Sequence, residues 1–384
     1  MQNVAVGWLA LQSFHSGAIL GVVTAARYAP MLLFGLWGGL AVDRMDTRSL
    51  LIVTQSLQAS LSLALGILAI SGHVQLVVLV CVVACVGIVD VFDVPSRQSV
   101  VGELVDRDNV GNAIALNAIS TNSARALGPA IAGGIIATLG VAPCFFINAT
   151  SFGAVIISLL AMRTSEFFPA TRELESRGQV RAGLRYIRHK PELLAPIVMV
   201  AVTGTLTWEF PVTLPLLTAT TFHGNAAAYG FAMAALGIGS VGGGWIAARR
   251  RRLGVRALAR SALVWGIVIL AAAAAPSLAA EYVLLLGVGV CAITFNAAAK
   301  TLLQTESASH MRGRVMSVWY IAWQGSTVLG APLVGTLGKA FGARYGLVVG
   351  GGAAMLVGAA YLKYSAAAAV EVPAAELAME LADE

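Results

Sequence analysis

Long apolar segments dominate this chain, and their length limits what it can fold into. Stretches able to cross about 30 Å of hydrocarbon lie near 17–42, 50–71, 75–93, 112–138, 142–162, 194–219, 226–248, 259–275, 281–299, 315–338 and 343–363. Hydrophobic residues make up 58% of the sequence and charged residues only 11%, which excludes a soluble domain of this size. The pattern predicts an all-α membrane protein with eleven full spans, since a segment in lipid must satisfy its own backbone hydrogen bonds.

The first apolar stretch, residues 1–12, is shorter than the others. At 1.5 Å per residue it covers about 18 Å. Its start would then lie near the membrane midplane, where a charge is costly. We therefore expect an incomplete first helix of twelve. A signal peptide is disfavoured because no basic segment precedes the apolar run.

An internal repeat divides the chain in two. Residues Gly128, Gly133, Gly140 and Glu103 of the first half reappear as Gly330, Gly335, Gly342 and Glu306. A period of roughly two hundred residues is too long for a solenoid unit. It fits a membrane transporter built from two parallel six-helix halves that are related by a pseudo-two-fold axis, with a substrate cavity between them.

The polar segments set the expected boundaries. We expect an N-terminal bundle over 1–162 (truncated helix 1 and helices 2–6), a cytoplasmic linker over 163–192, a C-terminal bundle over 193–364 (helices 7–12) and a mobile acidic tail over 365–384. In the linker, Val180, Leu184 and Ile187 recur at helical spacing amid basic residues. This pattern predicts an amphipathic helix that lies on the inner leaflet.

Orientation follows from the basic residues. Of the 25 Lys and Arg residues, all except Arg27, Arg125, Lys339 and Arg344 fall in one set of alternate loops and in the C-terminal flank. The positive-inside rule makes those loops, the linker and the C-terminus cytoplasmic. The net charge of +6 therefore reflects membrane topology, and no nucleic-acid partner is expected.

Motifs for cofactors and metals are absent from the sequence. Cys81 and Cys85 have no His or Asp neighbour suited to a metal site. The string Gly237–Gly242 matches a dinucleotide fingerprint but lies inside a span, where Gly239 and Gly243 indicate close helix packing instead. With no P-loop, nucleophile elbow or zinc helix, we expect no cofactor, no metal and no ATP-driven mechanism.

Several motifs resemble a known family. Gly39-Leu-Ala-Val-Asp43-Arg44-Met-Asp-Thr-Arg48 resembles the loop signature of the major facilitator superfamily, from which it departs at Asp46 and Thr47. The segments 92–98, 112–116, 125–129 and 312–317 resemble its drug and siderophore exporter branch, which includes the enterobactin exporter. The resemblance implies twelve helices in two bundles that rock about a central cavity. It also implies proton-driven export of small hydrophobic or amphipathic molecules across a bacterial inner membrane. We expect the chain to act as a monomer.

Charged residues at the predicted cytoplasmic ends of the spans form a candidate gate: Asp43, Arg44, Arg48, Asp93, Arg97, Arg312 and Arg314. A two-bundle arrangement is expected to bring them together, so that ion pairs favour the state closed to the inside. Partly exposed pairs contribute about 0–1 kcal/mol each, which is enough to tilt a balanced equilibrium. The alternative is that these charges only anchor loops.

The fifth long span carries a glycine- and proline-rich segment, Gly128-Pro129-Ala-Ile-Ala-Gly133-Gly134. It resembles the fifth-helix signature of antiporters, with one residue too many between Pro129 and Gly133. A proline removes a helical hydrogen bond and glycines permit close approach, so we expect a bent, tightly packed helix. The resemblance favours export over import.

Ionisable residues within spans mark the candidate site, because each costs about 2.5–3.5 kcal/mol to insert. Glu209, followed by Pro211 in the seventh span, is the predicted proton-coupling carboxylate, with Asp90 as a second candidate. Arg27 and Arg125 are candidate cavity residues, and Arg125 is equally well a structural counter-charge. The rival interpretation of Glu209 is a static pair with Arg27 or Arg125.

Aromatic residues near Glu209 and in the eleventh span are candidates for the cavity surface: Trp208, Phe210, Trp319, Tyr320 and Trp323. They would suit a large amphipathic ligand, although packing is the more common role. The sequence thus predicts a proton-coupled exporter. The alternatives are a metabolite importer or uniporter and a transport-dead truncated paralogue, while an intramembrane enzyme would need a catalytic cluster that the sequence lacks.

Overall fold

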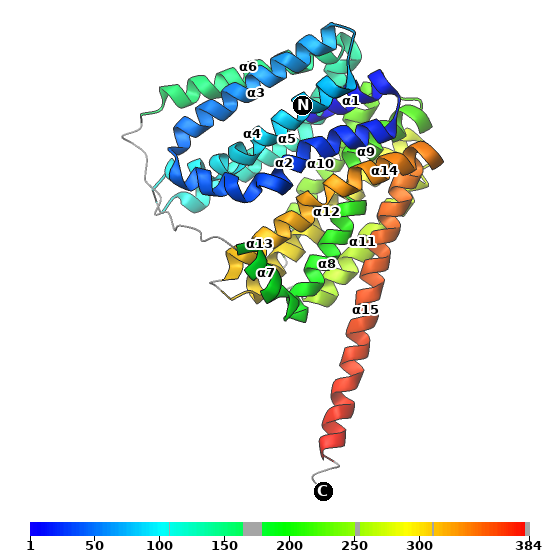
Figure 1. Ribbon diagram of the computed structural model, residues 1–384. Coiled ribbons are helices and arrows are strands. Elements are labelled where there is room, and N and C mark those ends of the chain that lie inside the picture. Colours follow the sequence, from blue (N-terminus) through cyan, green and yellow to red (C-terminus); the bar gives the residue numbers. More distant parts are fainter. Residues whose placement is uncertain (107, 164–178, 250–253, 309–310, 381–384) are drawn as a thin grey trace.

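The described part of the chain is entirely helical. The computed structural model describes residues 1–106, 108–163, 179–249, 254–308 and 311–380, and the side chains of 36–44, 179–181 and 364–380 lie outside the description. The first six helices are α1 (Gln2–Phe14), α2 (Gly17–Arg44), α3 (Thr47–Ile70), α4 (Leu76–Glu103), α5 (Val110–Leu139) and α6 (Val141–Ala161). They form the upper part of the molecule in Figure 1.

The second half repeats this order with two interrupted helices. A short helix α7 (Gln179–Arg188) precedes α8 (Pro191–Leu206), α9 (Phe210–Leu216) and the π-helix η2 (Leu217–Thr221), and then α10 (Ala226–Arg249), α11 (Val255–Ala273) and α12 (Leu278–Glu306). The last segments are α13 (Arg312–Tyr320), the π-helix η4 (Ile321–Gly325), α14 (Thr327–Phe341) and α15 (Arg344–Glu380). The seventh and eleventh spans are therefore each built from more than one piece.

Within the described residues, 9 helices are long and apolar enough to cross a membrane, fewer than the eleven full spans expected. Two expected spans account for the difference. The middle of α5 is polar, since Asn117, Thr121, Asn122 and Arg125 lower its hydropathy. The eleventh span, built from α13, η4 and α14, is the other, since Tyr320, Gln324, Ser326 and Thr327 lower its hydropathy. Both segments remain helical and occupy their places in the twelve-helix order.

The sequence repeat is also a repeat of backbone conformation. Gly140 and Gly342, predicted to be equivalent, have φ of 85° and 105°. Each ends one helix and precedes the next, α5 to α6 and α14 to α15. His15 and His223 likewise share the left-handed region at φ of 49° and 51°, just after α1 and just after η2. The equivalent turns require backbone conformations that glycine adopts most easily.

Close helix contacts within each half depend on small residues. In the first half α2 packs on α4 and α3 on α6, and in the second half α10 packs on α12 and α11 on α15. Gly239 and Gly243 lie against the backbone of α12 at Leu286 and Val290, as the small-residue pattern predicts. A Cβ at either glycine would clash with a carbonyl oxygen, so α10 and α12 owe their short separation to these positions.

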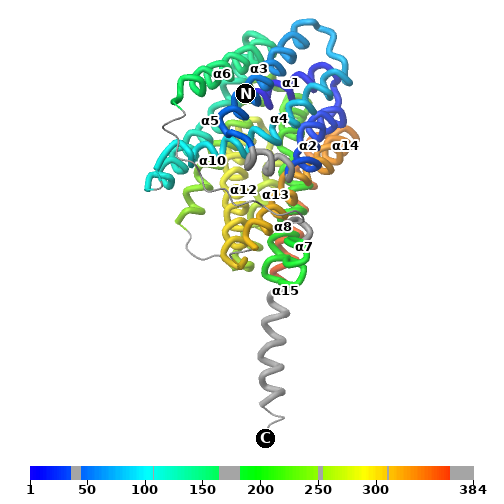
Figure 2. Tube along the Cα trace, turned by 60° about the vertical axis from the view of Figure 1, so that its left-hand side comes forward, coloured from blue at the N-terminus to red at the C-terminus, as the bar shows by residue number. Residues whose placement is uncertain are grey.

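The two halves meet along two equivalent helix pairs, α5 with α10 and α2 with α14. Gly133 of α5 lies against Gly230 of α10, while Gly335 of α14 lies against Gly17 of α2. Figure 2 shows both pairs, α5 beside α10 and α2 beside α14. These crossings lie near the ends where α2 and α10 begin, which the distribution of Lys and Arg predicts to be the outer end.

The linker helix α7 packs against the rest of the protein on one side and is exposed on the other. Ile187 is buried, and the backbone at Gly183 lies against the carbonyl group of Arg314 in α13. Leu184 remains exposed, and Val180 lies outside the described side chains. Ile187 therefore packs within the protein and Leu184 faces outward, while the position of this helix on the inner leaflet stays a prediction.

Candidate functional site

A cavity lies where the two halves face each other. Its wall is formed by Asn3 of α1, by Thr24, Arg27 and Tyr28 of α2, and by Pro211 of α9, together with apolar side chains of α1, α2 and α4. The helices α1, α2 and α4 belong to the first half and α9 to the second. An opening at this interface is in the position expected of a substrate path in a two-bundle transporter.

An ion pair joins α2 to α4 beside the cavity. Arg27 Nη2 lies 2.9 Å from Asp90 Oδ2, and Gln58 Nε2 of α3 donates a hydrogen bond to Asp90 Oδ1 at 2.8 Å. The side chains of Arg27 and Asp90 are only 19% and 23% exposed. The structure thus brings two predicted site residues together, and the charge of Arg27 is balanced within the first half.

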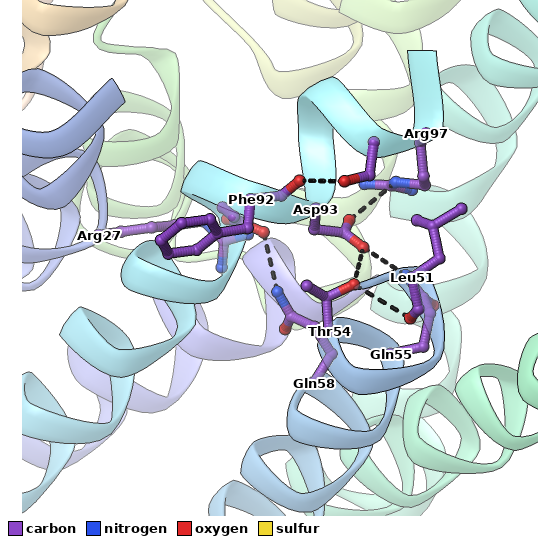
Figure 3. A network of polar contacts seen from close by, with 10 residues as sticks. Arg27, Leu51, Thr54, Gln55, Gln58, Phe92, Asp93 and Arg97 are labelled. Carbon is purple, nitrogen blue, oxygen red and sulfur yellow. Dashed lines mark hydrogen bonds and ion pairs between the residues drawn. The ribbon is translucent and has the colours of Figure 1, made fainter. Parts of the chain in front are cut away.

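A second acidic group, Asp93, is buried one turn further along α4. It accepts hydrogen bonds from Thr54 Oγ1 at 2.9 Å and from Gln55 Nε2 at 2.6 Å, both on α3. It also pairs with Arg97 Nε at 2.8 Å. Figure 3 shows this network extending from Arg27 to Arg97 across α2, α3 and α4.

The predicted gate residues whose side chains the structure describes do not form one cluster across the two halves. Arg97 pairs with Asp93 of its own helix, because a spacing of four residues places the two side chains on one face. Arg48 donates to the carbonyl oxygens of Leu159 and Leu160 at the end of α6, at 2.7 and 3.0 Å. These carbonyl groups have no hydrogen-bond donor inside their own helix, so Arg48 caps the C-terminal end of α6.

The departures from the loop signature have local roles. Asp46 accepts a hydrogen bond from Ser49 N at 2.8 Å and caps the start of α3. Thr47 Oγ1 donates to Glu103 Oε1 at 2.9 Å, which ties α3 to the end of α4. The side chains of Asp43 and Arg44 lie outside the described residues.

The two predicted gate arginines of the second half lie at the start of α13. Arg314 Nη1 contacts Met311 Sδ at 3.4 Å, and its carbonyl group lies against Gly183 of α7. Arg312 is exposed. Among the described residues, therefore, Arg314 connects α13 to the linker helix and forms no salt bridge with α4.

Glu209 occupies a break in the seventh span. Regular α-helix stops at Leu206 and resumes at Phe210, and Trp208 N bonds back to Thr203 O at 3.1 Å. This interruption agrees with the loosening expected near Pro211. Glu209 is 1% exposed, and among the described residues neither carboxylate oxygen has a hydrogen-bond partner or a salt bridge. The Thr327 hydroxyl on α14 lies nearby without meeting hydrogen-bond geometry.

Gly330 allows α14 to pack against this carboxyl group. A Cβ at Gly330 would lie 2.7 Å from Glu209 Oε1 and would also clash with the carbonyl oxygen of Thr205. The π-helix η4 lies close to the end of α8, since Gly204 of α8 lies against the Ala322 and Trp323 carbonyl groups. Two irregular segments, the α8–α9 break and η4, thus meet at Glu209. Such interruptions of regular helix are common at functional sites.

The predicted aromatic residues come together beside the break. Trp208 lies 5.7 Å from Trp323 and 6.4 Å from Phe210 between ring centroids, and Trp319 lies 5.2 Å from Trp323. Trp208 also contacts Trp265 of α11 at 5.5 Å. Trp208 and Trp323 are only partly buried, whereas Phe210 and Trp319 are buried, so the first two are the ones able to present an aromatic surface.

The fifth-helix segment packs as the motif predicts, but unevenly. A Cβ at Gly133 would lie 2.7 Å from Gly230 Cα, whereas one at Gly134 would meet nothing within 4 Å. Gly128 approaches only the backbone nitrogen of Met1, and Pro129 O lies against Gly230. Arg125 is exposed on α5 and forms no salt bridge among the described residues.

Sequence reasoning did not identify Tyr28, Gln58 and Trp265 of this region, nor Glu281 of α12. Gln58 was recognisable as a polar side chain within an apolar span. Glu281 was not, because it stands at the edge of its span, where an acidic residue is ordinarily solvated. In the structure Glu281 is fully buried in the first turn of α12, and neither carboxylate oxygen has a hydrogen-bond partner among the described residues.

Two repeated helical halves with an opening between them are the architecture of a membrane transporter. The model of the transmembrane secretion effector family, which is part of the major facilitator superfamily, matches residues 1–380. The chain belongs to this family. It is therefore a multi-pass membrane transporter and not an enzyme.

Distant relatives include two bacterial transporters. The chain is 27% identical over 355 residues to the multidrug efflux pump Tap of Mycobacterium tuberculosis (strain ATCC 25618 / H37Rv), covering 88% of this chain and 83% of that one. It is 25% identical over 246 residues to the staphyloferrin A transporter of Staphylococcus aureus (strain NCTC 8325 / PS 47). That match covers 62% of this chain and 60% of the relative, which is less than two thirds of its length.

Solved structures confirm the fold. A bacterial homologue of the human lysosomal transporter Spinster, in an inward-facing and occupied conformation, matches with a TM-score of 0.71 at 14% identity, covering 95% of each chain. A structure of nucleoside transporter NupG matches with a TM-score of 0.72 at 10% identity, covering 94% of each chain. At these identities the likeness shows the major facilitator fold alone.

Proposed function

We propose that this protein is a secondary active transporter that exports hydrophobic or amphipathic small molecules in exchange for protons, by alternating access. The observation that carries the proposal is Glu209, a buried carboxyl group without a described partner at a break in the seventh span. The multidrug efflux relative supports export.

Glu209 is proposed to bind and release the proton. A buried carboxylate that lacks a cation and hydrogen bonds is costly when charged. Protonation or an approaching cationic substrate removes that cost, so the two compete for one site. Arg27 is already paired with Asp90, which supports a coupling role over a static pair of Glu209 with Arg27. Asp90 remains the second candidate.

Alternating access is proposed to open and close the contacts of α5 with α10 and of α2 with α14. The basic loops support a bacterial cytoplasmic membrane, with the linker and the C-terminus inside. We propose the domain boundaries given above and a monomeric unit. Trp208 and Trp323, which are partly buried beside Glu209, supply the aromatic surface for substrate.

The proposal is tested by expressing the chain in an efflux-deficient bacterial host and measuring ethidium export together with a panel of drugs and siderophores. We expect lower accumulation of at least one hydrophobic or amphipathic compound. Nigericin, which collapses the pH gradient, should abolish that export. Export that persists without a pH gradient would contradict proton antiport, and accumulation of the compound above that of the empty host would indicate import.

A further inference from the structure

Exposed basic side chains are concentrated on and just after α7: Arg185, Arg188, His189 and Lys190. The helix that carries them is held in place. Ile187 is buried, and Tyr186 Oη accepts a hydrogen bond from Ala308 N at 3.2 Å. Lys190 Nζ lies over the Tyr186 ring at 5.0 Å. Since Ile187 and Tyr186 hold α7 against the protein, its exposed basic side chains remain available to another partner.

Arg188 stands beside a groove formed with Pro191, Leu194 and Tyr361. The groove lies between α7, the start of α8 and α15. The candidate span of α8 begins at Pro191 and that of α15 ends at Lys363, and α8 packs against α15. Both helices therefore cross the same membrane surface at this point. Leu194 is 39% exposed, so an apolar wall faces the hydrocarbon just beneath the guanidinium group of Arg188.

We propose that this groove binds one anionic phospholipid of the bilayer, with its phosphate on Arg188 and an acyl chain along Leu194 and Tyr361. A guanidinium group matches phosphate geometry with two parallel hydrogen bonds. The apolar wall suits an acyl chain and gives a free phosphate ion nothing further to contact. Lys363, exposed at the end of the α15 span, adds positive charge, while Glu192 is the exposed acidic residue next to the groove.

The lipid would act on the transporter through α7. This helix lies against α13 at Gly183 and Arg314, and α13 continues into η4 beside Glu209. A bound headgroup therefore restrains the start of the eleventh span. This inference concerns the membrane surface of the protein and is independent of which molecule is exported.

The experiment is native mass spectrometry of the purified full chain with phosphatidylglycerol or phosphatidylcholine, for the wild type, Arg188→Gln, Arg188→Lys and Arg260→Gln. Arg260 is exposed on α11 and lies outside the groove, so it provides a matched loss of charge. We expect the wild type to retain one phosphatidylglycerol in preference to phosphatidylcholine. Arg188→Gln should weaken that preference by about fivefold, the effect of one basic residue at an anionic surface.

The variants distinguish the proposal from its alternatives. Arg260→Gln should keep the preference, since it leaves the charge at the groove unchanged. Arg188→Lys should fall between the wild type and Arg188→Gln, since it keeps the charge but loses the two parallel hydrogen bonds. Equal retention by Arg188→Gln and the wild type would overturn the proposal. An equal loss in Arg188→Gln and Arg260→Gln would also overturn it, by showing attraction to net charge only. Displacement of the lipid by excess inorganic phosphate would show a site for the free anion instead.

Discussion

Two adjacent glycines on α5 provide a matched test of how the halves meet. A Cβ at Gly133 would lie 2.7 Å from Gly230 Cα and 2.8 Å from Ala226 O. These are backbone atoms, which cannot rotate away. A Cβ at Gly134 would meet nothing within 4 Å. Gly133→Ala and Gly134→Ala are thus the same chemical change in two different environments.

The expected magnitudes follow from this geometry. Alanine is favoured over glycine inside a helix by about 1 kcal/mol, and overpacking typically costs about 1–3 kcal/mol. Gly134→Ala should therefore leave stability unchanged or raise it by up to about 1 kcal/mol. Gly133→Ala should be less stable than Gly134→Ala by about 1–3 kcal/mol, because α5 and α10 must separate.

Gly133→Ala should also shift the conformational equilibrium toward the state in which α5 and α10 are apart. A change of about 1–3 kcal/mol alters an equilibrium by about 5- to 150-fold. Leu20 is 1% exposed and lies on α2 near the end where the halves meet. Maleimide labelling of Leu20→Cys, in a background without the native cysteines, therefore measures this shift. Labelling should be faster in Gly133→Ala than in Gly134→Ala. Equal labelling rates and equal unfolding temperatures would refute the reasoning.

Three further predictions concern the polar network and the break. Arg27→Gln should lower the free energy of unfolding by about 2 kcal/mol because Asp90 loses its charged partner and keeps only the hydrogen bond from Gln58; thermal unfolding of Arg27→Gln with Asp90→Asn should show recovery, and no recovery would exclude a paired interaction. Arg97→Ala should cost less than about 1 kcal/mol, since Arg97 is 58% exposed and Asp93 keeps its two hydrogen bonds from α3; a larger loss in the same assay would count against this. Gly330→Ala should impair ethidium export while Gly352→Ala, which meets nothing within 4 Å, should not; equal export would contradict the packing assigned to Gly330.

Much of the fold could be predicted because lipid imposes simple requirements. Span length, the glycine repeat and the placement of Lys and Arg can each be read from the sequence without knowing any tertiary contact. The equivalence of Gly140 and Gly342 was readable because a turn with positive φ favours glycine wherever the repeat places it. The aromatic grouping around Trp208 was also predictable. Trp208 and Phe210 flank Glu209 in the sequence, and Trp319 and Trp323 are one helical turn apart.

Other features depend on contacts that the sequence does not encode locally. Arg97 was expected to reach across the halves, but Asp93 lies one turn away on the same helix and is closer. The apolar residues of α7 were expected at the membrane surface, yet Ile187 is buried within the protein. Glu281 looked like an interfacial acid because its burial is produced by neighbouring helices and not by its own segment.

The role of Glu209 is tested most directly by measuring substrate binding and uphill transport in Glu209→Gln. The assay uses ethidium with proteoliposomes under an imposed pH gradient, and binding is followed at acidic and neutral pH by fluorescence of the tryptophan cluster. Glu281→Gln is the matched control, since Glu281 is also a buried carboxyl group without a described hydrogen-bond partner.

We expect Glu209→Gln to fold normally and to bind ethidium with an affinity that no longer depends on pH, because the group that exchanges a proton for the substrate is gone. It should also fail to accumulate ethidium against a gradient. Glu281→Gln should keep both pH-dependent binding and uphill transport. Full proton-driven accumulation by Glu209→Gln would contradict the account and direct attention to Asp90.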